Sequence, residues 1–162
     1  MGQSIPGVYD QAPAGIYWSY LTETWDLIAM DDRYFKQPPK EYETNAALEE
    51  EYSLLGETQH QWLKNTLMRS AKPAFLILGT QIINGAEAKF IESFEQSRKN
   101  YRRFVEDVKA SGRLVIYGSG DTHVSEIQSF GSQLYGFPLY EITSSGIHSF
   151  SPPKLWDNKK RL

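Results

Sequence analysis

The chain has 162 residues, 40% of them hydrophobic and 14% aromatic, so it is long enough to bury a core and too apolar to be disordered. A formal net charge of −3 provides no basic surface for nucleic acid or for an anionic membrane, and no stretch approaches the length of a membrane span. The absence of cysteine excludes disulfides, a thiol nucleophile and a cysteine-ligated zinc site. Residues 1–7 lack the charged start and apolar segment of a signal peptide, and the sequence does not determine the cellular compartment.

The first part of the chain predicts an irregular arm followed by a β-hairpin. Residues 1–14 are rich in Gly, Pro and Ala and are expected to be irregular. Gly15–Leu21 and Thr24–Met30 are dominated by β-branched and aromatic residues, which is typical of two paired strands. Asp31-Asp32-Arg33 follows the second strand. It is either a surface turn with a local ion pair or an arginine that grips an oxyanion with the help of Asp31.

A helix and a buried strand are expected next. Apolar residues recur at helical spacing from Gly56, a tolerable N-cap, and the helix must stop before Pro73, because the residue ahead of proline avoids helical angles. His60 lies off the apolar stripe, so we expect it to be exposed and give it no role. Ala74–Leu78 reads as a buried strand that ends at the polar pair Thr80-Gln81.

The second half predicts one more helix and three strands. Apolar residues keep a helical rhythm from Phe90 to Val108, and Ser111-Gly112 supplies a left-handed C-cap. Leu114–Tyr117 is a short buried strand, and Val124–Phe130 and Pro138–Thr143 resemble half-buried strands. The order strand, strand, helix, strand, helix, strand, strand, strand indicates an α/β protein with a mixed β-sheet and flanking helices.

A carboxylate and an imidazole follow the strand at Leu114–Tyr117. Gly118-Ser119-Gly120 is expected to break the strand, because glycine accepts backbone angles that other residues resist, and Asp121 and His123 come directly after it. Ligands of open α/β sheets sit beyond the carboxyl ends of strands, and an Asp with a His can hold Mn, Fe, Zn or a similar ion. Asp after Gly is also an ordinary turn residue, and taken alone the pattern favours that interpretation.

Several motifs in a fixed order together resemble one known family. They are Gly15–Ser19 with Met30–Lys36, Leu55–Leu63, Leu78–Gln81, Ser119–His123 and Pro138–Gly146. The chain is similar in these segments to the alkaline phosphatase D group of the metallophosphatase (calcineurin-like phosphoesterase) superfamily. The similarity covers nearly all of residues 15–150.

The resemblance implies a metal-dependent phosphomonoesterase or phosphodiesterase, built on an αββα sandwich, in which a metal-bound hydroxide attacks a phosphate ester. Asp121 and His123 would be catalytic and hold the metal, which in such a family could be Fe, Ca, Mn or Zn. Arg33 would be catalytic and neutralise charge on the phosphate. The remaining candidates for substrate binding are Asp31, Thr80, Gln81 and His148. Export is expected if the chain resembles most of the family.

The sequence departs from the family pattern in one respect. The family places its other metal ligands earlier, in an Asp-rich Gly-Asp motif and a Trp-Asp-Asp-His-Asp-like or Gly-Asn-His-like motif, and neither is present. Asp26 follows Trp25 but falls inside a predicted strand. We therefore expect residues 15–150 to form the C-terminal part of such a domain, followed by a polar tail over 151–162. An apolar sheet face would then need a partner chain that supplies the missing N-terminal half.

Other functions remain as alternatives. The chain could be a catalytically inactive remnant that acts as a protein-interaction module. A nucleotide-binding domain is less well supported, because Gly118-x-Gly120 lacks the third glycine and the helix that should follow it. A serine hydrolase is disfavoured because no Gly-x-Ser-x-Gly motif occurs.

Overall fold

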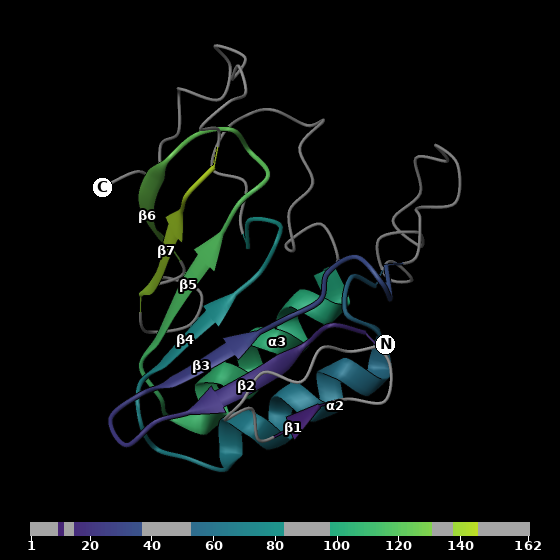
Figure 1. Cartoon of the computed structure of the whole chain (residues 1–162), viewed down its shortest axis with the longest axis vertical. Coiled ribbons are helices and arrows are strands. Elements are labelled where there is room, and N and C mark those ends of the chain that lie inside the picture. The colour runs from purple at the N-terminus through teal and green to yellow at the C-terminus, as the bar shows by residue number, and fades with distance from the viewer. Residues whose placement is uncertain (1–9, 12–14, 37–52, 83–97, 131–137, 146–162) are drawn as a thin grey trace.

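A computed structural model describes residues 10–11, 15–36, 53–82, 98–130 and 138–145. These residues form a 7-stranded sheet in the order β1-β2-β3-β4-β5-β7-β6, with two helices (Figure 1). The strands are β1 (Asp10–Gln11), β2 (Trp18–Leu21), β3 (Asp26–Ala29), β4 (Ala74–Ile77), β5 (Val115–Ser119), β6 (Glu126–Phe130) and β7 (Leu139–Thr143). The helices are α2 (Gly56–Met68) and α3 (Arg98–Ser111). The α/β class with a mixed sheet and flanking helices is confirmed. So is the order of the predicted elements, to which the structure adds β1 within the stretch expected to be irregular.

The centre of the sheet is parallel and its two sides are antiparallel. Strand β3 pairs in parallel with β4, β4 with β5 and β5 with β7, whereas β2 and β6 run antiparallel to their neighbours β3 and β7. The carboxyl ends of β3, β4, β5 and β7 therefore meet at one edge of the sheet. This edge is where the sequence places its polar candidates.

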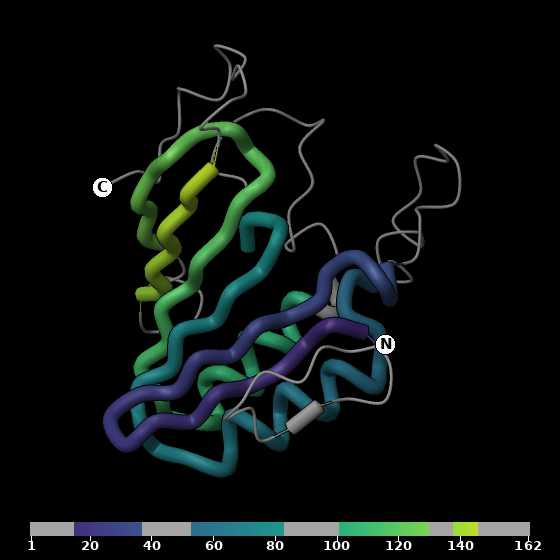
Figure 2. The backbone as a smooth tube through the Cα atoms, viewed as in Figure 1, coloured from purple at the N-terminus to yellow at the C-terminus, as the bar shows by residue number. Residues whose placement is uncertain are grey.

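One face of the sheet packs against both helices. Buried side chains of α2 and α3 join those of the central strands in one hydrophobic cluster, which includes Ile28, Leu63, Leu76, Phe104 and Tyr117. The helices lie beside the β2–β5 part of the sheet, and β6 and β7 lie away from them (Figure 2). In the part of the chain that the structure describes, no helix is long and apolar enough to cross a membrane.

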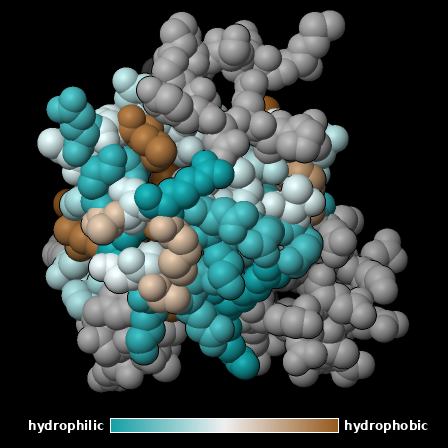
Figure 3. Space-filling view, turned by 90° about the horizontal axis from the view of Figure 1, so that it is seen from below, coloured by the Kyte–Doolittle hydropathy of each residue, from teal (hydrophilic) through white to brown (hydrophobic). Residues whose placement is uncertain are grey.

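The opposite face of the sheet carries two rows of apolar residues. Cross-strand neighbours share a face, so the pairing registers define both rows. The first row is Tyr20, Leu27, Phe75, Ile116 and Tyr140, and the second includes Trp18, Ala29, Ile77, Ile142 and Ile127. Ile127 is 50% exposed and Ile142 39%. The lower end of the molecule as drawn in Figure 1 differs from this face: hydrophilic residues cover a broad area there, with a few hydrophobic residues grouped beside it (Figure 3).

A buried ion pair joins the amino ends of the central strands. The side chains of Arg113, just before β5, and Asp26, the first residue of β3, are both fully buried, and the Arg113 Nη2 donates to Asp26 Oδ2. The Arg113 guanidinium also donates to the carbonyls of Leu67, Lys72 and Pro73. Lys72 Nζ lies 3.2 Å from Asp26 Oδ1. Asp26 is thus inside a strand, as predicted, and serves the fold at the edge opposite the candidate site.

The prediction that His60 is exposed is wrong. His60 is 1% exposed, and it lies near Arg103 and Asp107 of α3, whose charges act on its ring. Burial, which disfavours the charged imidazolium, lowers the pKa of His60 to about 4. The apolar stripe of α2 predicts only the face that packs on the sheet. His60 lies outside that stripe and is buried because α2 also packs against α3.

Glycines adjust two element ends differently from the prediction. Strand β5 continues through Gly118 to Ser119, so Gly118 does not break the strand as predicted. Its role is to leave space, because a Cβ at this position would lie 3.0 Å from the Phe75 ring. Leu55, not Gly56, is the N-cap of α2, and Gly56 begins the helix with φ +67°. Gly112 has φ +64° after α3, which confirms the predicted left-handed C-cap. The predicted start of that helix, at Phe90, lies outside the described residues.

Replacing Arg113 with Met should lower the free energy of unfolding by about 3–5 kcal/mol, because it leaves the Asp26 carboxylate buried without its main partner. Urea unfolding followed by circular dichroism measures this change. The double variant Arg113→Met/Asp26→Leu should recover most of the loss, since no buried charge remains. If Arg113→Met were as stable as the parent, Arg113 would not be the main partner of a buried Asp26 carboxylate.

The stability of the chain should fall as the pH is lowered from about 6.5 to about 4, because the unfolded state binds a proton at His60 in this range and the folded state does not. A pKa lowered from 6.5 to about 4 corresponds to a loss of about 3 kcal/mol. Urea unfolding at several pH values measures the slope. The variant His60→Gln should lack this contribution, and an identical slope in both proteins would disprove it.

Candidate functional site

Four loops meet at the carboxyl edge of the parallel strands. They follow β3 (residues 30–34), β4 (78–81), β5 (120–123) and β7 (144–145). Backbone hydrogen bonds extend the sheet pairing into these loops, from Met30 N to the Ile77 carbonyl, from Leu78 N to the Gly118 carbonyl and from Ser144 N to the Ser119 carbonyl, each 2.9 Å long. The loops therefore start from fixed positions relative to one another.

The loop after β5 presents Asp121 and His123 to solvent. Both residues are exposed, whereas Thr122 between them is 5% exposed. Both also have a left-handed backbone, with φ 70° for Asp121 and 57° for His123, which is uncommon for residues other than glycine. The sequence had led us to expect the unusual angles at the neighbouring glycines. Gly120 itself has no positive φ, and a Cβ there would lie 3.4 Å from the carbonyl oxygen of Gly79, which is close to an ordinary contact.

Arg33 and Asp121 come together although their strands are separated by β4. Arg33 Nη2 lies 3.5 Å from Asp121 Oδ2, and the two side chains are 52% and 43% exposed. Exposed ion pairs contribute little to stability, so the pair is not needed to hold the fold. The arrangement leaves a cation and a carboxylate within reach of a ligand at this edge.

Asp31 supports the turn that carries Arg33. Its Oδ1 accepts hydrogen bonds from the backbone N–H groups of Arg33 (3.0 Å) and Tyr34 (2.8 Å), and its Oδ2 accepts one from Ile16 (3.0 Å). Burial raises the pKa of Asp31, but the three backbone donors outweigh it and hold the pKa below the usual value. Gln59 of α2 holds the same segment, donating to the Asp31 carbonyl and accepting from its N–H at 2.7 Å each. Asp31 reaches the site through the backbone of Arg33.

Asp32 holds the β3 and β4 loops together, a role that the sequence did not indicate. It is 3% exposed, and its Oδ2 accepts a 2.6 Å hydrogen bond from the N–H of Thr80. Gly79 leaves room for this carboxylate, since a Cβ there would lie 2.8 Å from Asp32 Oδ1. Thr80 is itself fully buried. Two adjacent aspartates after a strand look alike in sequence, and only the packing separates their roles.

Gln81 is buried in a polar layer between β4, β6 and β7. Its Nε2 donates to Thr143 Oγ1 at 2.8 Å and to Glu126 Oε1 at 2.9 Å, and it is 2% exposed. Glu141, fully buried, accepts hydrogen bonds from Ile82 N at 2.8 Å and from Gln128 Nε2 at 2.6 Å. Thr80 and Gln81 thus lie at the expected edge but inside the protein, where they fix the loops.

Asp121 and His123 fit a divalent ion in chemistry but not in number. One carboxylate and one imidazole are suitable donors for such an ion. Within the described ranges, no group of three or more His, Cys, Asp or Glu side chains could hold a metal ion. His148, the other histidine predicted for the site, lies outside the described residues. The residues present supply part of a coordination shell.

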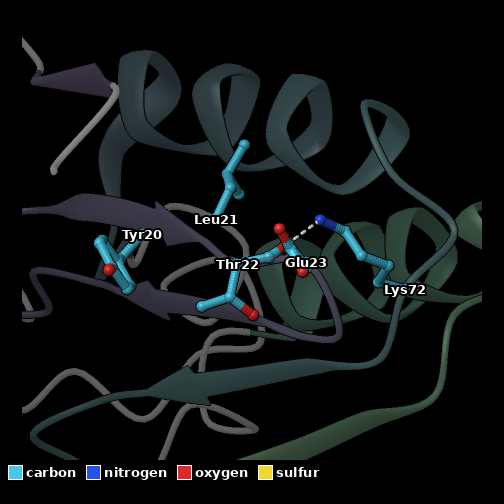
Figure 4. A pocket seen from close by; sticks show the side chains of 5 residues that line it. All are labelled: Tyr20, Leu21, Thr22, Glu23 and Lys72. Carbon is cyan, nitrogen blue, oxygen red and sulfur yellow. Dashed lines mark hydrogen bonds between the residues drawn. The ribbon is translucent and has the colours of Figure 1, made fainter.

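A shallow pocket of about 590 Å³ lies at the opposite edge of the sheet, beside the β2–β3 turn. It is lined by Tyr20, Leu21, Thr22, Glu23 and Lys72 (Figure 4). The Lys72 amino group donates to the carbonyl of Thr22 and pairs with Asp26, so its charge already serves the buried ion pair. This pocket adds no group to the candidate site.

Comparison with known proteins agrees with the motif resemblance. The family model described as PhoD-like phosphatase matches residues 12–160, which include the hairpin, both helices and the loops that carry Arg33, Asp121 and His123. A search of curated proteins finds none that matches. Because the family match extends over most of the sequence, the chain belongs to the PhoD-like phosphatase family.

Proposed function

We propose that this chain contributes to a metal-dependent phosphoester hydrolase that acts on phosphomonoesters or phosphodiesters. Membership of a phosphatase family supports a phosphoesterase in general. The single observation that carries the proposal is the 3.5 Å distance between Arg33 Nη2 and Asp121 Oδ2. Asp121 lies on the loop after β5, which also exposes His123. A cation and two metal-type donors at the carboxyl edge of parallel strands are suited to bind a metal ion and a phosphate ester.

Each residue has a distinct part in the proposal. Asp121 and His123 bind a divalent ion, with Fe, Ca, Mn or Zn as candidates, and such an ion supplies an activated water and neutralises charge on the ester. Arg33 pairs with Asp121 in the absence of a ligand, and its five N–H donors suit the oxygens of a phosphate. Asp31 fixes the backbone of Arg33 through two hydrogen bonds to the same turn.

The remaining metal ligands are proposed to come from a second polypeptide. Two features support this arrangement. Among the described residues no group of three or more metal-type donors gathers, and the sheet face opposite the helices carries two apolar rows whose members include Ile127, Ile142 and Tyr140. Apolar rows across a sheet are what a second sheet packs against. A partner that covers this face would also bring its own loops to the carboxyl edge.

An inactive interaction module is the second candidate function. The observation that favours it is that the Arg33 guanidinium already lies 3.5 Å from the Asp121 carboxylate, so this carboxylate has a cationic neighbour without a metal. The apolar sheet face serves either function. Metal binding by the chain separates the two, because an interaction module has no need of Asp121 and His123 as ligands.

The purified chain should bind Mn²⁺ or Zn²⁺, and the double variant Asp121→Ala/His123→Ala should weaken binding by at least about tenfold, since both donors are lost. Titration calorimetry and metal analysis after gel filtration measure this. Glu106→Ala, which removes an exposed carboxylate on α3, is the matched control and should bind like the parent. Parent and double variant that bind equally, or not at all, would favour the interaction module.

Replacing Arg33 with Ala should weaken the binding of inorganic phosphate to the metal-loaded chain by about tenfold or more, because a charge-assisted hydrogen bond is lost. Arg33→Lys should recover part of the affinity but not the paired geometry. Arg102→Ala changes an exposed arginine on α3 and should have no effect. Equal phosphate affinity in Arg33→Ala and the parent would remove Arg33 from the site.

A further inference from the structure

The turn that carries Asp121 and His123 is conformationally unusual at both ends. Two of its three residues have positive φ, 70° and 57°, and neither is glycine. Such a backbone costs free energy and persists only where surrounding contacts enforce it. The only turn-internal backbone hydrogen bond given by the described structure runs from Thr122 N to the Gly120 carbonyl, at 2.9 Å, and it does not involve His123. The hydrogen bond that the His123 backbone does make is with another segment.

That segment is the loop after β7. Ser145 Oγ accepts a 3.2 Å hydrogen bond from the N–H of His123, and the carbonyl of Ser145 accepts one from Ser125 Oγ at 3.3 Å. Ser145 thus contacts the loop at two points that flank residue 124. The pairing of Ser119 with Thr143 in the sheet and the 2.9 Å bond from Ser144 N to the Ser119 carbonyl fix where Ser145 lies.

The neighbouring serine makes a different contact. Ser144 is exposed and donates its backbone N–H to the carbonyl of Ser119, the last residue of β5, and any residue except proline provides such a donor. Ser145 instead uses its hydroxyl as the acceptor for His123. Ser144 therefore acts through its backbone N–H and Ser145 through its side-chain hydroxyl. Replacing each serine with alanine gives a matched pair of variants, of which only one loses the hydrogen bond to its partner.

We propose that Ser145 is a positioning residue of the site, whose hydroxyl holds the His123 backbone in its left-handed conformation so that the imidazole and the Asp121 carboxylate face one ion. The hydroxyl acts through the backbone of His123 and does not touch the ligand. The part that concerns the ion rests on the function proposed above, and the part that concerns the backbone stands on the geometry alone.

The test compares Ser145→Ala, Ser145→Thr and Ser144→Ala with the parent. Two quantities are measured: the intraresidue NOE between the amide and α protons of His123, which is intense when φ is positive, and the dissociation constant for Mn²⁺ or Zn²⁺ by calorimetry. Ser145→Ala should weaken this NOE and raise the dissociation constant at least about tenfold, the effect typical of losing a group that orients a metal ligand. Ser145→Thr keeps a hydroxyl and Ser144→Ala keeps the backbone donor, so both should behave like the parent.

The outcomes separate this inference from the proposed function. A parent chain that binds no metal would disprove the function, and the NOE of His123 would then decide the role of Ser145 by itself. An unchanged NOE in Ser145→Ala would overturn the inference whatever the metal affinity. A weakened NOE with unchanged metal affinity in a metal-binding chain would also overturn it, because the backbone would then be irrelevant to ligation. Urea unfolding of each variant identifies a general loss of structure.

Discussion

One buried ion pair, between Arg113 and Asp26, constrains the parallel strands at their amino ends. The guanidinium reaches the end of α2, the segment before β4 and the first residue of β3 from its own position ahead of β5. It therefore fixes the amino ends of three parallel strands at once. The pairing registers carry this alignment along the strands, so the opposite ends of β3, β4 and β5 are aligned with one another as well.

Buried and exposed polar groups are segregated at the carboxyl edge. Asp32, Gln81 and Glu141 are buried and hydrogen-bond neighbouring loops, and in two of these contacts the donor is a backbone N–H. Arg33 and Asp121, in contrast, are about half exposed and touch only at 3.5 Å. The buried groups hold the scaffold, so the exposed pair is not among the contacts that fix these loops.

Periodicity and breakers in the sequence predicted the order of the elements, the stop of α2 before Pro73 and the C-cap at Gly112, because each rests on local chemistry. The polar residues at strand ends were visible in the sequence, but their meeting at one edge follows from the parallel pairing, which the sequence does not show. The burial of His60 was not, because it depends on how α3 packs against α2. Nor could the sequence show that Asp121 and His123, rather than the adjacent glycines, adopt positive φ, because the backbone of His123 contacts Ser145, which is distant from it in the sequence.

The position of β4 between β3 and β5 gives the contact between Arg33 and Asp121 a geometric consequence. Strands two apart in a sheet are separated by about 9.6 Å, so the pair must bridge the end of an intervening strand. Most of that span is covered by the guanidinium arm, since an aspartate side chain is short. In the proposed function, the length of this side chain limits how wide a ligand can be if it is to contact both Arg33 and Asp121 across the end of β4. Arginine and lysine differ in both reach and head-group shape, so a change at position 33 would alter which ligand sizes fit as well as how tightly they bind.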